Sequence, residues 1–521
     1  MKKILKYGMC IVLLGAGTSC TNLDEEIQDE FTQSFVPSNP GLGKIPNKNR
    51  ATPNDGLGGA FATLLNYWHA TSGGYFAVQE LGTDEAVITQ KGGDWYDGGL
   101  YIRMHHHEFS PQTFGINDTW NNAYGGIYQC NDLLGVGGLA NGQVAQLKTL
   151  RAYLYWILLD VFGNVPIVTT AGVGAAQSTR AQVYAFVEAE LLAAIPDLPA
   201  GRQEYGRFNQ SGAYALLSRL YLNAGVYTGT PQYQKAINAA DMVINSGIYS
   251  LASNYASVFA PDNCEDRSSD TNGATNEMIF IIPFDYSTGQ GSFWSMMTLH
   301  YPSQLTYKLT DQPWNGFSTL EDFYNSYEAT DKRREANFIV GPQYDLNGVP
   351  ILDLAFDKAD PDGAEINYTP FINELFPNAS RQGGARFGKF SFTIGQGANS
   401  DNDFPILRYG EVLLNKAEAL CRLNNNWANV EAMALVDQIR ARAGLGSLSD
   451  KTAGGFLAER GRELFVEEHR RTDLIRFGAY GNAWWEFPGE SNPNHSIMAI
   501  PIEQMQASAS TKFPLKQNPG Y

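Results

Sequence analysis

The sequence predicts a mostly α-helical protein in which a scaffold of paired helices carries one large, irregular, loop-rich face. Two observations lead to this prediction. Apolar and small residues recur at helical spacing in paired stretches, some early and some late in the chain. Between these pairs, residues 250–400 are rich in Gly, Pro, Asn and Tyr and show little periodicity. Because a long irregular insertion in a compact protein is usually functional, we expect this segment to bind a ligand.

The first two helical pairs are expected before the irregular segment. One pair occupies residues 118–134 and 147–160. The second begins with residues 211–225 and returns over residues 233–244, before a stop signal that ends at Gly247. Apolar and small residues follow one stripe of its first helix: Ala213, Leu216, Leu217, Leu220, Tyr221 and Ala224.

The same helix-turn-helix plan recurs after the irregular segment. Residues 406–423 and 430–442 form one expected pair, joined by three asparagines. A further helix is expected over residues 455–477, where acidic and basic residues recur at spacings that allow pairs along and between turns. Paired helices of about 34 residues with small residues at the crossings resemble tetratricopeptide units. The predicted fold is therefore a tetratricopeptide-like helical-repeat scaffold.

The N-terminus is typical of an exported lipoprotein. Residues 1–19 combine a lysine-rich start, a short apolar run and a series of small residues, which is the order of a secretory signal peptide. Cys20 follows directly, so we expect cleavage before it and attachment of lipid to it. The alternative is an ordinary signal peptide beside a chance cysteine. Residues 21–50 are polar and rich in Asn, Pro and Gly, which is typical of a tether.

These observations predict how the chain is divided. We expect a lipoprotein signal peptide at 1–19, a lipidated tether at 20–50 and one domain at 51–521, with helical pairs near 118–160, 211–245, 406–442 and 455–477 and an irregular ligand-binding segment at 250–400.

Composition and charge exclude several classes of partner. The 521 residues are 43% hydrophobic and 12% aromatic, which suits a large folded core and argues against disorder. The formal net charge is −17, and removal of residues 1–19 with their three lysines leaves −20. A surface this negative repels nucleic acid and anionic lipid. No internal stretch approaches the roughly 18–20 apolar residues of a membrane helix.

The cysteines do not suggest a disulfide framework or a zinc site. Cleavage removes Cys10 and lipidation uses Cys20, which leaves Cys130, Cys264 and Cys421 without a CxxC motif. A single disulfide between two of these three cysteines remains an open alternative. Cys130 and Cys421 lie in apolar helical runs, which favours buried free thiols.

Four ordered motifs resemble one known family. Residues 155–166 read YWILLDVFGNVP, and residues 407–419 read LRYGEVLLNKAEA. Residues 459–478 begin with ERGRELF and end with RFG, and the chain ends in KQNPGY at residues 516–521. Together they resemble the SusD/RagB family of outer-membrane lipoproteins from glycan-utilising Bacteroidetes. The likeness runs from Cys20 to the last residue.

The resemblance implies a non-catalytic, lipid-anchored protein on the outer face of the outer membrane. Family members capture oligosaccharides and close as a lid over a SusC-like TonB-dependent barrel. The acidic residues 24–26 are similar to the tract that sends such lipoproteins to the cell surface. We expect no cofactor, no metal ion and no nucleic-acid partner.

The first candidate site is a glycine-rich loop. Residues 92–99 place Trp95 and Tyr96 between Asp94 and Asp97. Sugar rings present flat CH faces to aromatic platforms and hydroxyl groups to carboxylates, so this loop suits an oligosaccharide. It also follows residues 82–85, which resemble a T-D-E segment after which the family often presents a binding aromatic. The alternative is a structural loop whose glycines serve turn geometry.

Two further clusters lie in the irregular segment, where the family tends to place its other aromatic contacts. Trp294 stands in the sequence Phe-Trp-Ser at 293–295, and Trp314 and Asn315 stand in the sequence QPWNGF at 312–317. Trp in a loop indicates ligand contact more strongly than Trp on a helix. The Trp residues in or beside helical stretches are better explained by packing: Trp120, Trp156, Trp484 and Trp485.

Other chemistry is less well supported. Residues 105–107 are three histidines, but consecutive residues of an extended stretch alternate sides and ligate one ion poorly. Residues 345–348 and 360–363 lack the distal Glu of an EF-hand loop. No nucleophile-elbow, zincin, P-loop or Rossmann motif occurs. Two alternatives stay open: a lipid-anchored glycoside hydrolase, whose carboxylate pair is defined only in space, and a lid that binds peptides or another nutrient.

Overall fold

The computed structural model describes residues 53, 55–66, 68–202, 205–263, 273–285, 291–355, 360 and 363–521. These residues belong to one compact unit. The predicted signal peptide, Cys20, the tether and Cys264 lie outside the described residues.

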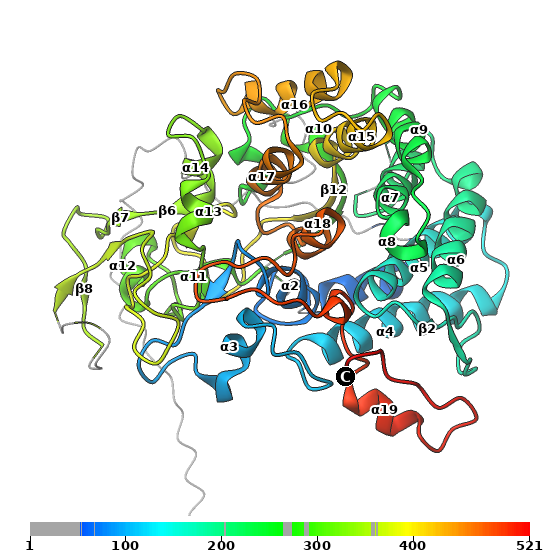
Figure 1. Cartoon of the computed structure of the whole chain (residues 1–521), viewed down its shortest axis with the longest axis horizontal. Helices are drawn as coiled ribbons and strands as arrows, with labels where there is room; N and C mark the ends of the chain where they lie inside the picture. The colour runs from blue at the N-terminus through cyan, green and yellow to red at the C-terminus, as the bar shows by residue number, and fades with distance from the viewer. Residues whose placement is uncertain are drawn as a thin grey trace, which may run out of the picture. The chain divides into compact units, whose positions relative to one another are not determined.

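The predicted helical scaffold is confirmed. It consists of α4 (Ile116–Val136), α5 (Asn141–Val161), α6 (Arg180–Ala194), α7 (Gln210–Leu222), α8 (Ala224–Thr228), α9 (Tyr233–Ile244), α15 (Tyr409–Leu423), α16 (Val430–Arg442), α17 (Ala453–Leu464) and α18 (Arg470–Phe477). Neighbouring helices pack in sequence as α4–α5, α5–α6, α7–α9 and α15–α16. Helix α9 also packs on α15, so the scaffold continues across the irregular segment (Figure 1).

Local sequence explains several helix starts. Thr179, Asn209, Asn429 and Thr452 each accept a hydrogen bond from a backbone N–H in the first turn of α6, α7, α16 and α17. These side chains satisfy donors that have no partner within the helix. Helix α6 was not among the predicted helices, although its start carries a capping box in which Gln182 also bonds back to Thr179.

Most remaining elements are short. Before the scaffold lie α1 (Gly58–Ala62), α2 (Gly74–Glu80), β1 (Val87–Ile88) and α3 (Leu100–His105). The irregular face holds α10 (Ala274–Glu277), β4 (Met278–Ile282), α11 (Trp294–Thr298), α12 (Gln304–Tyr307), β5 (Phe317–Ser318), α13 (Glu321–Asn325), α14 (Lys332–Asn337), β6 (Phe338–Ile339), β7 (Gly341–Pro342), β8 (Leu352–Asp353), β9 (Ala364–Glu365), β10 (Asn367–Tyr368), β11 (Arg386–Phe387) and β12 (Phe404–Arg408). Elsewhere are β2 (Val165–Pro166), β3 (Gln177–Ser178) and α19 (Ile502–Ser508). None of the described helices is both long enough and apolar enough to span a membrane.

The strands form two-stranded antiparallel pairs rather than one sheet. The pairs are β1–β5, β2–β3, β4–β12, β6–β11, β7–β10 and β8–β9. The β4–β12 pair joins the beginning and the end of the irregular segment, because Met278 pairs with Arg408 and Ile282 with Phe404. In Figure 1 the helices α4 to α9 lie on one side and the short elements α12, β7 and β8 on the other.

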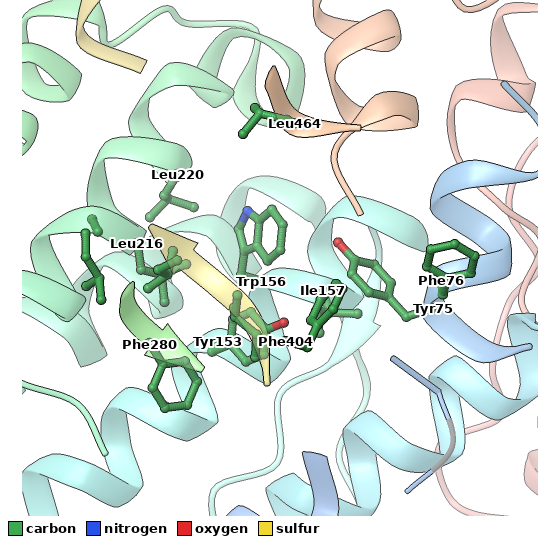
Figure 2. Close-up of a cluster of buried hydrophobic side chains, with 14 of the residues drawn as sticks. Tyr75, Phe76, Tyr153, Trp156, Ile157, Leu216, Leu220, Phe280, Phe404 and Leu464 are labelled. Atoms are coloured by element: carbon green, nitrogen blue, oxygen red, sulfur yellow. The ribbon is translucent and has the colours of Figure 1, made fainter. Parts of the chain in front are cut away.

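A single large core connects the scaffold to this irregular face. Figure 2 shows side chains from α2, α5, α7, β4, β12 and α17 that pack together. Helix α5 is buried on nearly every side from Ala145 to Val161, so it is a central helix rather than an amphipathic surface helix. Phe208 and Phe280 stack with their ring centroids 3.7 Å apart, which links the start of α7 to β4.

Several predicted helix limits are wrong. Helix α5 begins at Asn141 rather than at residue 147, and the expected helix 211–225 is divided into α7 and α8. Residues 406–408 belong to strand β12 and not to the helix that follows. The expected helix 455–477 is two helices, because Val466 and Glu468 adopt left-handed backbone conformations between α17 and α18. Their backbone N–H groups donate to carboxylate oxygens of Glu85 and Glu80, at 2.8 and 2.6 Å. Contacts from distant residues thus replace the helical hydrogen bonds at this break.

The charges around α17 form buried ion pairs, most of them with residues of other elements. Glu459 on α17 lies 2.8 Å from Arg333 Nη1, 2.9 Å from Arg440 Nη1 and 2.8 Å from Arg462 Nη2. Glu463, one turn later, contacts Arg408 at 2.7 Å and Arg333 at 3.1 Å. These pairs fasten α17 to α14, α16 and β12. A buried charge that loses its partner is costly, so the network depends on every member.

The two cysteines within the described residues are free thiols, as their apolar helical surroundings predicted. Cys130 on α4 and Cys421 on α15 are both buried and unbridged. Burial raises the pKa of the Cys130 thiol to about 12 and that of Cys421 to about 11, so both stay protonated at neutral pH.

Candidate functional site: an aromatic platform between two loops

One strand pair brings two predicted clusters together. Strand β1 pairs antiparallel with β5, with Ile88 opposite Phe317. In an antiparallel pair, the residues after one strand lie beside the residues before the other. The loop 89–99 therefore lies beside residues 312–316, although more than 200 residues separate them in sequence.

The loop 89–99 is held by a tight turn. Lys91 and Asp94 exchange backbone hydrogen bonds of 3.0 and 3.1 Å around Gly92 and Gly93. Trp95 follows with a φ of 64°, an uncommon left-handed conformation for a residue other than glycine. Such strain persists only where surrounding contacts fix it.

Three contacts fix Trp95 and its loop against the second loop. The Trp95 indole N–H donates to the carbonyl oxygen of Trp314 at 2.6 Å. The Lys91 ammonium nitrogen donates to the carbonyl oxygen of Gly316 at 3.1 Å. Gly316 leaves room for the indole, since a Cβ atom there would lie 2.7 Å from Trp95 Cζ2. The lysine is fully buried, which lowers its pKa well below that of an exposed lysine, with a further lowering from Arg386.

The second loop rests on helix α11. The backbone N–H groups of Trp314 and Gly316 donate to the carbonyl oxygens of Met296 and Met297, each at 2.7 Å. The N–H of Asn315 donates to Leu299 at 2.9 Å. Because these bonds involve the backbone, they set the position of Trp314 while leaving its side chain at the surface.

The result is a set of partly exposed aromatic rings that we call the aromatic platform: Trp95, Tyr96, Phe293 and Trp314. The side chains of Tyr96 and Trp314 are 51% and 44% exposed. Phe293 stacks on Trp314 with ring centroids 6.1 Å apart and an interplanar angle of 22°. Beside the rings, Asp94 is exposed and accepts a hydrogen bond from the hydroxyl of Tyr301. Exposed rings flanked by a carboxylate suit a ligand with flat apolar faces and hydroxyl groups.

Two predicted site residues are buried instead. Trp294 is 1% exposed, with its ring centroid 4.8 Å from that of Phe76 and 5.1 Å from that of Phe390. It is a core residue because α11 turns it inward. Asn315 is 0% exposed and donates from Nδ2 to the carbonyl oxygen of Arg381 at 3.1 Å. Its φ of 57° suits asparagine, so its role is to form the turn.

Two residues of the site are absent from the predicted set. Phe293 lies immediately before Trp294, is partly exposed and stacks on Trp314, whereas Trp294 is buried. Tyr301 contacts Asp94 across more than 200 residues of sequence. If the limits of α11 were known, helical spacing could show which of Phe293 and Trp294 faces the core. The sequence does not give those limits. No local signal identifies Tyr301, because its contact is long-range.

The three histidines have separate partners, in keeping with a structural role. His105 Nε2 lies 2.7 Å from the carbonyl oxygen of Trp485, and burial lowers its pKa to about 4. His107 lies between the carbonyl oxygen of Gly82 and the carboxylate of Glu490, both at 3.0 Å. No group of three or more metal-ligating side chains occurs within the described ranges.

Comparison with known families decides where the chain belongs. A family model described as "SusD family" matches residues 269–521, and a model described as "Starch-binding associating with outer membrane" matches residues 76–222. The chain belongs to the SusD family. The two matched ranges contain both loops of the aromatic platform.

Individual relatives cover most or all of the chain at low identity. The starch-binding protein SusD of Bacteroides thetaiotaomicron is 24% identical, over 100% of this chain and 99% of the relative. A solved SusD superfamily protein from Parabacteroides distasonis has a TM-score of 0.70 at 22% identity, covering 89% of this chain and 98% of that one. Surface glycan-binding protein A of B. thetaiotaomicron, solved with laminarihexaose, has a TM-score of 0.67 at 21% identity, covering 89% and 99%. These structural likenesses establish the SusD fold.

Proposed function

We propose that this SusD-family protein binds oligosaccharides on its aromatic platform, without cleaving them, and delivers them to a SusC-like TonB-dependent transporter. The observation that carries the proposal is the convergence of the two loops, which places the exposed rings of Tyr96 and Trp314 beside Trp95 and the carboxylate of Asp94. Apolar rings stack on the CH faces of a sugar, and the carboxylate accepts hydrogen bonds from its hydroxyl groups.

The relatives support the same class of ligand. The relatives include a starch-binding protein and a surface glycan-binding protein, which are named for binding rather than for catalysis. A platform rather than an enclosed cleft also suits capture and release of a flexible chain. Neutral oligosaccharides fit best, because the protein carries a net charge of −17 and Asp94 lies at the platform itself.

The cell-surface part of the proposal rests on the N-terminal sequence and on the family. Lipidation of Cys20 would anchor the chain, and one matching family model is described as associating with the outer membrane. Replacement Cys20→Ser is expected to release the protein from membranes of cells that express it. Unchanged fractionation and unchanged lipid labelling of the variant would contradict the anchor.

The binding proposal is tested with the purified full chain in a detergent that carries no sugar headgroup. Isothermal titration uses a panel of neutral and charged oligosaccharides, and a reducing-end assay is run on the same samples. We expect saturable binding of a neutral glycan without new reducing ends. Release of reducing ends would favour the glycoside hydrolase instead, and binding of peptides but of no glycan would favour another nutrient.

A pair of variants locates the site. Trp314→Ala is expected to weaken binding by about 1–3 kcal/mol, which is the scale of one lost aromatic contact. The matched control is Tyr128→Ala on α4, because Tyr128 is 49% exposed and lies outside both loops. Equal affinity of both variants and the parent would show that the ligand binds elsewhere.

A further inference from the structure

A pocket adjoins the aromatic platform and has no role in the function proposed so far. Its volume is about 200 Å³, and it is formed by α3 and the residues that follow this helix. Leu100, Met104 and Phe114 provide an apolar lining. Arg103, Glu108, Ser110 and Thr113 provide polar groups. We call it the Arg103 pocket.

The polar groups retain hydrogen-bonding capacity. Arg103 donates from Nη1 to the carbonyl oxygen of Gly98 at 2.6 Å, and none of the ion pairs found among the described residues involves it. Its other N–H donors therefore remain available at an exposed position. Thr113 Oγ1 accepts from the backbone N–H of Ser110 at 2.7 Å, and Ser110 Oγ accepts from Gln112 at 3.2 Å, which leaves each hydroxyl able to donate.

Charge and size limit what the pocket can hold. Arg103 and Glu108 bring one positive and one negative side chain to the same pocket, so it favours a neutral ligand with both donors and acceptors. Its volume is below the roughly 300–1,000 Å³ typical of pockets for drug-sized ligands. A mostly polar lining that offers donors and acceptors beside a smaller apolar surface suits one ring of a neutral sugar.

The pocket is close enough to the platform for one ligand to reach both. The ring of Tyr101 contacts a ring of each, with its centroid 5.6 Å from that of Trp95 on the platform and 5.4 Å from that of Phe114 in the pocket. Trp95 and Phe114 are therefore at most about 11 Å apart. Arg103 also touches the platform loop directly through its bond to Gly98.

We propose that the Arg103 pocket is a second sugar subsite, which takes one neutral ring of an oligosaccharide whose other rings lie on the aromatic platform. The inference rests on the proposed function and adds a preference for chain length. Short oligosaccharides occupy the platform alone, and longer ones gain affinity by reaching the pocket.

The test measures affinity against chain length. Malto-, laminari-, xylo- and manno-oligosaccharides, each from disaccharide to octasaccharide, are titrated into the full chain and its variants. Glu108→Ala is the main variant, because Glu108 makes no contact with the platform loop among the interactions of the described residues. Arg103→Met is the second variant. Exposed charges elsewhere supply matched controls in Glu431→Ala on α16 and Lys235→Met on α9.

We expect Glu108→Ala to lose about tenfold in affinity for the longest ligands, the scale of one charge-assisted hydrogen bond, with no change for the shortest. Arg103→Met should show the same dependence on length, and both controls should match the parent. Equal affinity of Glu108→Ala and the parent at every length, or an equal loss at every length, would overturn the subsite while leaving the platform intact. A parent that binds none of these neutral series would overturn both proposals.

Discussion

The helical scaffold and the loop face hold their side chains in place by different means. In the scaffold, α4–α5, α5–α6 and α15–α16 pack as neighbours in sequence, and periodicity predicts their buried sides. In the loop face, Trp95 and Trp314 meet through a strand pair and one indole hydrogen bond across more than 200 residues. This difference predicts whether a substitution should change stability or ligand affinity. Changes in the scaffold should lower stability, whereas changes on the platform should lower affinity.

The largest expected effect is in the scaffold. Glu459→Gln leaves three guanidinium groups around α17 without their shared carboxylate. Arg333 keeps Asp331 and Glu463, and Arg440 keeps Glu328, so among the described ion pairs Arg462 is the partner that loses its carboxylate. Loss of one member of a buried ion network costs about 3–5 kcal/mol. Urea unfolding measures the loss. The matched control is Glu431→Gln, whose carboxylate is 60% exposed and pairs with Lys416, so it should change stability by less than about 1 kcal/mol.

Trp294→Ala tests the comparison within the loop face itself. Trp294 is buried among Phe76, Phe387 and Phe390, so its removal should cost about 3–5 kcal/mol of unfolding free energy. Trp314→Ala, twenty residues away and 44% exposed, should cost less than about 1 kcal/mol. Similar unfolding curves for the two variants would refute the assignment of one tryptophan to the core and the other to the surface.

Acid should weaken the scaffold through the carboxyl group of Glu459. Burial raises the pKa of the Glu459 carboxyl group. The guanidinium groups of Arg333, Arg462 and Arg440 outweigh this effect and lower the pKa from 4.5 to about 2. A lowered pKa in the folded state adds stability above pH 4.5, and that stability is lost as the pH falls toward 2. The unfolding free energy of the parent should fall over this range. Glu459→Gln should show a shallower fall, and identical pH profiles would contradict this origin of the acid sensitivity.

Gly316→Ala should displace the Trp95 ring of the platform. It should lower the unfolding free energy by less than Glu459→Gln or Trp294→Ala. The new Cβ would lie 2.7 Å from Trp95 Cζ2 and 2.8 Å from the carbonyl oxygen of Met297, so the indole must move. Overpacking of this kind costs about 1–3 kcal/mol, and the displaced ring should weaken oligosaccharide binding by a similar amount. Gly93→Ala on the neighbouring loop is the control, since no atom lies within 4 Å of its Cβ position. Equal affinities of the two variants would show that Trp95 need not be held in place.

Much of the scaffold could be predicted because its signals are local. The stripe from Ala213 to Ala224 and the end at Gly247 give α7 and α9 within a few residues, although the separate helix α8 was not predicted. The break between α17 and α18 could not be predicted, because the carboxylates that hold it belong to Glu80 and Glu85, almost 400 residues earlier in the chain. The same limit explains the errors at the site. Sequence located both loops but could not show that Trp294 and Asn315 face inward, or that Tyr301 reaches Asp94.

The most direct test of the account is calorimetric titration of a neutral oligosaccharide into the parent, Trp314→Ala and Tyr128→Ala proteins, with unfolding free energies measured on the same preparations. The account predicts saturable binding to the parent and to Tyr128→Ala. It predicts binding that is weaker by about 1–3 kcal/mol for Trp314→Ala, with a loss of unfolding free energy below about 1 kcal/mol. Full affinity in Trp314→Ala would contradict the central claim that the aromatic platform is where this protein holds its ligand.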